Sequence, residues 1–250
     1  MYLLLILAVL LTVLSCRFNW WRRNKDGIPI LMYHHIGLPP KDEKNKKLWV
    51  PIQKFDRQMA YLESHGYHSI TFKDLMAHLR EGSVLPDHPV IITFDDGAES
   101  VYLNGFPALR RYGFKACIFL ITEQSTLKIG QLKEMQAYGM EFGSHTKSHP
   151  NLVEVGEDER RMEITDSKKI LEERLGTPMI VFAYPYGQGA YEERIRERVE
   201  EAGYFFACGI RKGKVTFPLK NRYSLNRLLV RGDDFMIDLI LNLRKGRSRL

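Results

Sequence analysis

Two short polar clusters stand where hydrophobic runs of the chain end. Asp95 and Asp96 close the run Val-Ile-Ile-Thr-Phe, and His145 and His149 follow the run Met-Glu-Phe-Gly-Ser. Two adjacent carboxylates and two imidazoles four residues apart can give three ligands to a divalent metal and keep one carboxylate free as a base. This set is the minimum equipment of a metal-dependent hydrolase with an open coordination position.

Such clusters need a scaffold, and the chain alternates apolar runs with amphipathic segments. Seven short apolar segments are predicted strands, at 29–33, 90–94, 114–121, 140–143, 179–183, 204–209 and 225–230. Helices are predicted between them, at about 52–66, 71–79, 99–112, 131–138, 157–175, 190–202 and 233–243. Strands that alternate with helices form parallel sheets. The predicted fold is therefore α/β, a parallel (β/α) barrel of about seven strands.

Polar groups recur at the carboxyl ends of these strands, where parallel barrels place their chemistry. His34 and His35 follow the first strand, the aspartate pair the second, His145 the fourth, and the tetrapeptide Tyr184–Gly187 the fifth. An aspartate pair at a strand end is, by itself, usually a helix cap or turn. A pair of histidines four residues apart is by itself more often a surface pair. The convergence of all these groups on one rim favours the functional interpretation.

At this point the residues resemble a known family. Thr-Phe-Asp-Asp-Gly at 93–97 and Ser-His-Thr-Lys-Ser-His-Pro at 144–150 are similar to motifs of the polysaccharide deacetylases, the carbohydrate esterases of family 4. The resemblance extends from about residue 28 to about residue 235. It implies a distorted (β/α) barrel and the metal-dependent removal of N-acetyl groups from sugars.

The resemblance also implies a role for each matching residue. Asp95 would be the general base, and Asp96, His145 and His149 would be the metal ligands. Tyr186 falls where the family uses a backbone N–H to hold the oxyanion. Two imidazoles and a carboxylate suit zinc, with cobalt, nickel, iron and manganese as alternatives. The spacing of the two histidines would bring them together if their segment turned helically.

The chain departs from the common family pattern at two places. Ala183 stands where many members carry an arginine that contacts the catalytic aspartate, and the usual Leu-x-His near the C-terminus is absent. We hypothesise that Arg227 reaches the site and pairs with Asp95, lowering its pKa as an adjacent cation does. A second hypothesis makes His34 the proton donor to the leaving amine, since it ends a strand at the same rim.

The substrate prediction rests on the Leu-Met-Tyr-His-His-Ile run at 31–36 and on these departures. They look more like the poly-β-1,6-N-acetylglucosamine deacetylases than like peptidoglycan or chitin deacetylases. We expect an N-acetylglucosamine polymer of the envelope or biofilm as substrate. It would be bound partly by Pro185 and by Tyr184 and Tyr186, whose aromatic rings can stack on sugars. The alternatives are a peptidoglycan N-deacetylase, an O-acetyl esterase, and a membrane-tethered glycan-binding protein with a weak or inactive site.

Residues 2–14 are almost entirely apolar. As a helix they would be about 20 Å long, short of the roughly 30 Å hydrocarbon core, which suits a signal peptide or a short anchor. The positive-inside tendency of the following basic residues favours a cytoplasmic domain. The implied envelope substrate favours export, so we predict an extracytoplasmic protein, membrane-anchored or secreted. The predicted division is a leader or anchor (1–16), a basic linker (17–27), the catalytic domain (28–240) and a basic tail (241–250).

Composition adds few constraints. The 250 residues carry a net charge of +7, concentrated partly at the two ends, which suits anionic membrane or wall surfaces as well as solvated tails. No nucleic-acid-binding motif is present, so nucleic acid is not expected as a partner. The protein is expected to be a monomer. Cys117 and Cys208 lie in apolar runs and are predicted to be buried thiols, while Cys16 ends the leader.

Overall fold

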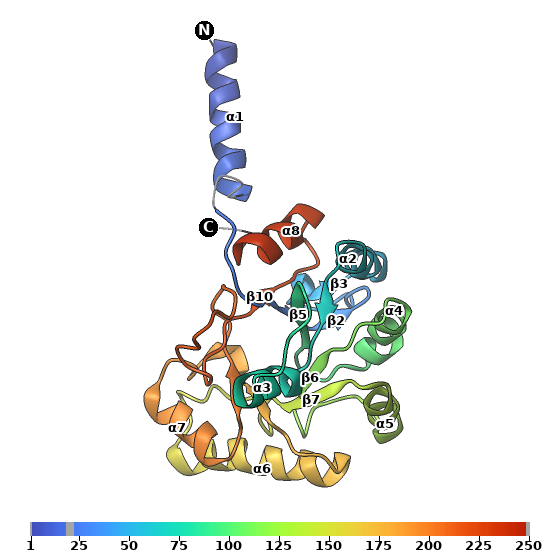
Figure 1. Ribbon diagram of the computed structural model, residues 1–250, viewed down its shortest axis with the longest axis vertical. Helices are drawn as coiled ribbons and strands as arrows, with labels where there is room; N and C mark the ends of the chain where they lie inside the picture. The colour runs from blue at the N-terminus through green and yellow to red at the C-terminus, as the bar shows by residue number, and fades with distance from the viewer. Residues whose placement is uncertain (1, 19–22, 249–250) are drawn as a thin grey trace.

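The computed structural model describes residues 2–18 and 23–248, and side chains from 2–15 and 23–248. Part of the predicted basic linker (19–22), the last two residues of the predicted tail and the side chain of Cys16 lie outside this description. Helix α1 (Tyr2–Phe18) projects from the rest of the fold (Figure 1). Its large apolar side chains from Tyr2 to Leu14 are exposed. Within the described ranges, no helix combines the length and apolar content that crossing a bilayer requires.

All seven predicted strand segments overlap an observed strand of one parallel sheet. These strands are Ile30–Tyr33 (β1), Pro89–Phe94 (β5), Cys117–Leu120 (β6), Glu141–Ser144 (β7), Val181–Ala183 (β8), Phe206–Cys208 (β9) and Leu228–Leu229 (β10). Their order is β10-β1-β5-β6-β7-β8-β9. Five of them are buried along their whole length, namely β1, β6, β7, β8 and β9. Of these, β1 and β6 are continuous hydrophobic runs, as is usual in parallel sheets.

The sheet curls toward closure. Leu225, just before β10, forms a parallel bridge with Cys208 of β9. This single bridge joins the two ends of the strand order and gives the distorted barrel. One short strand, His68–Ser69 (β4), adds to this sheet by pairing with β5. Two others, His35–Ile36 (β2) and Trp49–Val50 (β3), form a separate two-stranded parallel sheet.

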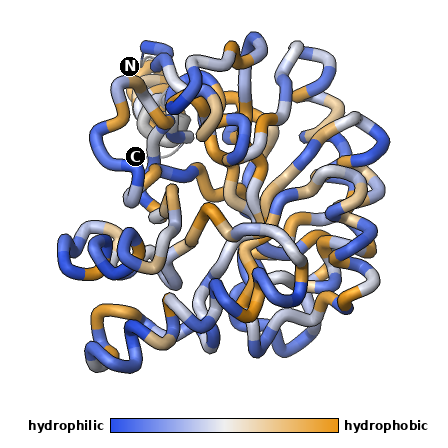
Figure 2. The backbone as a smooth tube through the Cα atoms, turned by 60° about the horizontal axis from the view of Figure 1, so that its bottom comes forward, coloured by the Kyte–Doolittle hydropathy of each residue, from blue (hydrophilic) through white to orange (hydrophobic). Residues whose placement is uncertain are grey.

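The helices that accompany the sheet are Ile52–Ser64 (α2), Phe72–Glu81 (α3), Phe106–Arg111 (α4), Ile129–Tyr138 (α5), Glu157–Leu175 (α6), Glu193–Glu201 (α7) and Met236–Lys245 (α8). Those from α2 to α7 lie between successive strands in the chain, and α8 follows the last strand. Most of them surround the sheet (Figure 1), whereas α3 packs Phe72 and Leu75 against inner residues of the strands. Hydrophobic segments concentrate in the central strands, and the peripheral helices are more polar (Figure 2). Thr71 caps α3 as the sequence predicts, in a reciprocal capping box with Asp74.

Successive strand residues pack on opposite sides of the sheet, which produces two hydrophobic clusters. Residues such as Ile118 and Ile92 pack against the helices. Residues such as Ile91, Phe119 and Phe206 form the second cluster, inside the curled sheet. This inner cluster fills the barrel beneath the carboxyl ends of the strands and leaves that end for polar groups.

The C-terminal boundary differs from the sequence prediction. Helix α8 continues to Lys245, two residues beyond the predicted helix (233–243), and extends into the segment predicted as a basic tail (241–250). The reason is apolar spacing: Leu239 and Leu243, four residues apart, are both buried in the main cluster, and Leu241 is buried as well.

A buried carboxylate at the amino ends of the strands, away from the polar rim, binds the first turn of helix α3. Glu141, at the start of β7, accepts hydrogen bonds from the backbone N–H groups of Phe72 (2.7 Å) and Lys73 (3.2 Å). These N–H groups belong to the first turn of α3, which has no intrahelical acceptor for them. Burial raises the pKa of Glu141 to about 7, and the two N–H groups only partly oppose that rise.

This shift makes stability depend on pH. Between 4.5 and about 7 the unfolded chain releases a proton that folded Glu141 retains, so the free energy of unfolding falls as pH rises through this window. Glu141→Gln removes the titration but keeps one acceptor oxygen. We expect the wild type to lose on the order of 3 kcal/mol relative to this variant across the window. Urea denaturation at several pH values measures the difference, and a pH-independent difference would contradict the assignment.

Candidate active site

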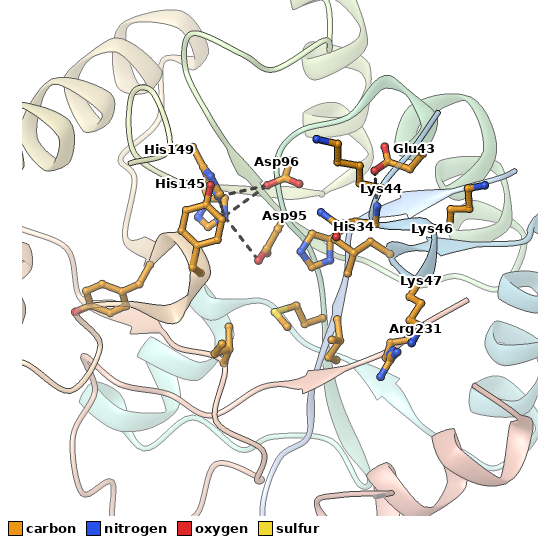
Figure 3. Close-up of a pocket in the computed structure, with 17 residues that line it drawn as sticks. His34, Glu43, Lys44, Lys46, Lys47, Asp95, Asp96, His145, His149 and Arg231 are labelled. Atoms are coloured by element: carbon orange, nitrogen blue, oxygen red, sulfur yellow. Dashed lines mark hydrogen bonds and ion pairs between the residues drawn. The ribbon is translucent and has the colours of Figure 1, made fainter. Parts of the chain in front are cut away.

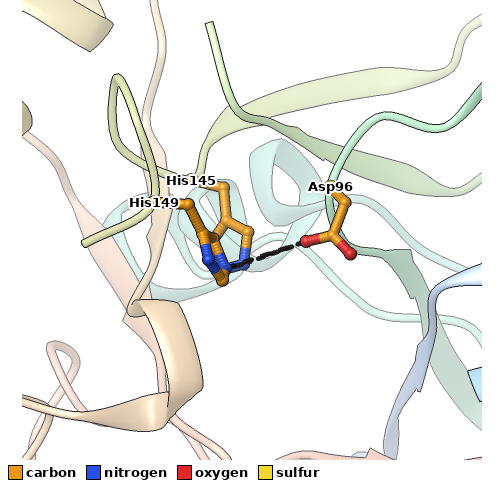
Figure 4. Close-up of side chains that lie close together, drawn as sticks. All are labelled: Asp96, His145 and His149. Atoms are coloured by element: carbon orange, nitrogen blue, oxygen red, sulfur yellow. Dashed lines mark hydrogen bonds and ion pairs between the residues drawn. The ribbon is translucent and has the colours of Figure 1, made fainter. Parts of the chain in front are cut away.

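Three potential metal ligands converge at the carboxyl ends of β5 and β7. The Nε2 atoms of His145 and His149 are 3.1 Å apart, and the Oδ1 atom of Asp96 lies 3.6 Å from the first and 3.8 Å from the second. Figure 4 shows the three side chains facing one another. Ligands around tetrahedral zinc lie about 3.3 Å apart, given bonds of about 2.0–2.1 Å. The triangle therefore fits a single divalent ion.

The protonation of this triangle also suits a cation. The Nδ1 atom of His145 donates to the carbonyl of Ala183 (2.7 Å), which leaves Nε2 unprotonated toward the cluster. Burial lowers the pKa of His145 to about 3 and also lowers that of His149. Burial raises the pKa of Asp96 to about 7, and the adjacent Asp95 carboxylate adds to this rise. A cation between the three side chains would favour the ionised form of Asp96 and the neutral form of both imidazoles, which are the forms that bind a metal.

The backbone that presents these groups is strained. Of the five non-glycine residues with positive φ in the described part of the chain, four stand at this site: Asp96, Thr146, His149 and Tyr186. Each costs on the order of 1–3 kcal/mol, and such residues concentrate at functional sites. The segment from His145 to His149 is not helical, so the helical turn predicted for it is wrong. Left-handed turns at Thr146 and His149 bring the two rings together instead.

A buried acid supports this turn. Glu163 of α6 accepts hydrogen bonds from the backbone N–H groups of Lys147 (2.8 Å) and Ser148 (2.9 Å), and from the Ser148 hydroxyl (2.7 Å). Glu163 was not among the site residues predicted from the sequence. Its signal was a charged residue on the buried side of α6, beside Ile164. A carboxylate placed there requires polar partners.

Arg227 makes the contact hypothesised from the sequence. Its NH1 and NH2 atoms donate to the two oxygens of Asp95 at 2.6 Å and 2.8 Å, and its Nε donates to the Gly209 carbonyl. Both side chains of the pair are buried. Burial alone would raise the pKa of Asp95, but the Arg227 guanidinium, with help from His145, outweighs burial and holds that pKa well below its usual range. Asp95 is therefore ionised.

His34 borders the same cavity, close to Asp95 in Figure 3. Its Nδ1 atom is buried and finds no hydrogen-bond partner among the described residues. Burial lowers the pKa of His34 to about 4, although the Asp95 charge opposes this change. His34 is thus neutral near pH 7. The neighbouring His35 instead stacks on Trp49, with ring centroids 4.2 Å apart.

The tetrapeptide Tyr184–Gly187 supplies one exposed aromatic ring rather than two. Tyr184 is fully buried and its hydroxyl donates to the Tyr223 carbonyl, so stacking of this ring on a sugar is excluded. Pro185 is buried in the short turn that follows β8. Tyr186 is 60% exposed, and its ring centroid lies 4.6 Å from that of His149.

These groups open into one cavity of about 810 Å³, which is within the usual range for small-molecule sites. Asp95, Asp96, His145 and His149 line one side of it, and a loop between β2 and β3 lines the other (Figure 3). The candidate metal ligands, the ionised carboxylate and an exposed tyrosine thus share one space that a sugar unit can enter.

Comparison with known proteins agrees with this geometry. Residues 83–207 match the family model described as polysaccharide deacetylase. YxkH of Bacillus subtilis, which carries the same family name, is 31% identical over 216 residues, covering 84% of this chain and 74% of that protein. The poly-β-1,6-N-acetyl-D-glucosamine N-deacetylase of Staphylococcus aureus strain MRSA252 is 27% identical over 208 residues, covering 76% and 70%.

Two solved structures share the fold. The Streptococcus pyogenes deacetylase PplD, in complex with acetate, superposes with a TM-score of 0.79 at 28% identity, covering 87% of this chain and 98% of that one. IcaB from Ammonifex degensii superposes with a TM-score of 0.71 at 28% identity, covering 84% and 94%. The predicted distorted barrel is confirmed. The chain belongs to the polysaccharide deacetylase family, the hydrolases of carbohydrate esterase family 4.

Proposed function

We propose that this protein is a metal-dependent hydrolase that removes N-acetyl groups from an N-acetylglucosamine-containing polysaccharide. The observation that carries the proposal is the triangle of Asp96, His145 and His149 beside an ionised Asp95. These three residues would hold the ion, with zinc favoured by the two imidazoles. A divalent ion bound there supplies a Lewis acid that polarises a carbonyl oxygen and lowers the pKa of water.

Asp95 is the proposed general base. Its Oδ2 atom lies 3.9 Å from the Nε2 atom of His145, beside the ligand triangle but tied to Arg227. The guanidinium keeps the carboxylate ionised and fixes its orientation, so it can take a proton from an attacking water. The N–H of Tyr186 is the proposed oxyanion donor; the next two N–H groups are engaged in turn hydrogen bonds to Tyr184 and Pro185.

His34 is the proposed proton donor to the leaving amine. Being neutral near pH 7, it must first gain a proton, and its electrostatic interaction with Asp95 supports a relay of the proton that Asp95 removes from water. The exposed Tyr186 ring is the proposed stacking surface for a sugar.

Poly-β-1,6-N-acetylglucosamine is the first polymer to test, because the S. aureus relative is named for that activity. Peptidoglycan and O-acetylated glycans are the alternatives for the same site. Mass spectrometry of the products separates them: loss of acetyl with a new free amine marks N-deacetylation, and acetate release without an amine marks an esterase. We further propose an extracytoplasmic location, with the exposed apolar helix α1 as leader or anchor.

Metal dependence is tested on the purified full chain. Treatment with a chelator should abolish acetate release from poly-N-acetylglucosamine, and restoring single metals should recover it, zinc foremost. Asp96→Asn should lower activity by more than about 100-fold, beyond the 10–100-fold typical of outer-shell partners. Asp158→Asn, an exposed carboxylate on α6, is the matched control. Full activity in chelator would refute the proposal, and glycan binding without acetate release would favour a binding protein.

The role of Arg227 is tested through pH. Without its charge the pKa of Asp95 should rise, so the acidic limb of kcat/KM should move to higher pH, by about 1–3 units in Arg227→Met. Arg227→Lys, which keeps the charge, should shift the limb less. Because Arg227 is buried, circular dichroism of each variant must first show native folding. Folded variants with an unmoved acidic limb would rule out this role.

The role of His34 is tested with two leaving groups. In His34→Gln, hydrolysis of the N-acetyl substrate should fall by about 100-fold or more, because general acid catalysis contributes about 10²–10⁴. Hydrolysis of 4-nitrophenyl acetate should change little, because its leaving group departs without a proton. Equal losses on both substrates would assign His34 a positioning role instead.

A further inference from the structure

The wall of the cavity opposite the candidate metal ligands is rich in cations. The loop from β2 to β3 contributes Lys44, Lys46 and Lys47, and Arg231 joins them after β10 (Figure 3). We call these four residues the basic rim. In Figure 3 the side chain of Lys46 points away from the candidate ligands.

The backbone under the basic rim is held in place. The N–H of Leu48 donates to the Asn45 carbonyl, and the N–H of Gly232 donates to the Lys47 carbonyl at 2.8 Å. The Lys54 ammonium donates to the carbonyl of Gly232 and to that of Asp234. These bonds join the loop to the segment after β10 and keep Lys47 beside Arg231. The backbone that carries these cations is therefore fixed by hydrogen bonds.

The carboxylates around the cavity already have partners. Asp233 pairs with Arg231 (3.1 Å) and, more weakly, with Lys47 (3.9 Å). Glu43 accepts a hydrogen bond from the Asn45 N–H at 2.7 Å. On this side four cations therefore face two carboxylates, and no ion pair involves Lys44 or Lys46 within the described part of the chain.

On the catalytic side, by contrast, the two carboxylates outnumber the one cation before an ion is bound. Asp95 is neutralised by Arg227, and the charge of Asp96 faces the imidazoles of His145 and His149. Once a divalent ion is bound, the whole cavity is net positive. Such a cavity attracts an anionic substrate and repels a cationic one.

We propose that the basic rim makes this enzyme select a glycan that carries an anionic group, a phosphate or a carboxylate, near the acetamide to be cleaved. This inference rests on the proposed function and specifies its substrate class. Lys44, Lys47 and Arg231 are the specificity-determining residues, and they act on binding rather than on the chemical step.

The same charge acts against the product. Hydrolysis of an acetamide adds water across the C–N bond, releases acetate and leaves an amine that is protonated near neutral pH. A neutral N-acetylglucosamine polymer thus becomes cationic as the reaction proceeds, and the cations of the basic rim repel it. On such a polymer we expect widely spaced deacetylation, because units next to a new ammonium bind poorly.

The test compares oligosaccharides of equal length that all contain N-acetylglucosamine. One is fully acetylated and neutral, one carries a phosphate monoester, one carries a lactyl carboxylate, and one has a single free amine. Dissociation constants are measured by calorimetry on the full chain in chelator, and kcat/KM is measured on the zinc-loaded chain. The variants are Lys44→Gln with Lys47→Gln, and Lys41→Gln as a control on the same loop but outside the cavity wall.

We expect at least one anionic oligosaccharide to bind about five- to tenfold tighter than the neutral one, and the amine-bearing one more weakly. The double variant should lose most of this preference through Kd and KM, and Lys41→Gln, which lies outside the cavity wall, should keep both the preference and the activity. Raising salt from about 0.02 M to about 0.5 M should shrink the preference.

Equal affinities for the neutral and anionic oligosaccharides would overturn the inference, as would a preference that the double variant retains in full. The phosphate and carboxylate arms identify which anion is recognised. If the anion preference is present but no oligosaccharide releases acetate, the proposed function fails while the charge selectivity stands. If acetate is released from all four at equal kcat/KM, the function stands and the basic rim has no role in selection.

Discussion

The buried ion pair between Asp95 and Arg227 is the interaction on which the rest of the site depends. It joins the end of β5 to the segment before β10, two parts of the chain 132 residues apart. Taking two charges out of water is costly, and the geometry must repay that cost. Here two parallel hydrogen bonds between the side chains offset the cost, and the remaining Nε donor of Arg227 binds the Gly209 carbonyl. The pair is therefore both a clasp across the nearly closed barrel and an electrostatic control of Asp95.

That control separates two adjacent carboxylates. Asp95 and Asp96 are neighbours in sequence, yet Arg227 holds the pKa of the first low while burial raises that of the second to about 7. The left-handed conformation of Asp96 turns its carboxylate away from Arg227 and toward His145 and His149. One aspartate is thus available for proton transfer, and the other faces two neutral imidazoles. Two environments thus shift the pKa values of the two neighbouring carboxylates in opposite directions.

The strain at this site has identifiable support. The turn from His145 to His149 contains two residues with positive φ. Two of its backbone N–H groups, those of Lys147 and Ser148, donate to Glu163 of α6. His145 is fixed from the other side by the Ala183 carbonyl. The Arg227 guanidinium lies over the Phe119 ring, with its Cζ atom 5.3 Å from the ring centroid. A rigid barrel and a well-packed inner cluster can hold such a geometry in place, as precise ligand placement requires.

Much of this protein was determined by the sequence alone. The seven strands follow from apolar runs that any parallel sheet must bury, and the order of polar residues at their ends follows from local pattern. Arg227 could be named as a partner for Asp95 because Ala183 left that place empty. The tertiary structure decided what depends on distance across the fold: the left-handed histidine turn, the support from Glu163, the burial of Tyr184 and the basic rim opposite the ligands. These features arise where segments far apart in sequence meet, and no local periodicity records such a meeting.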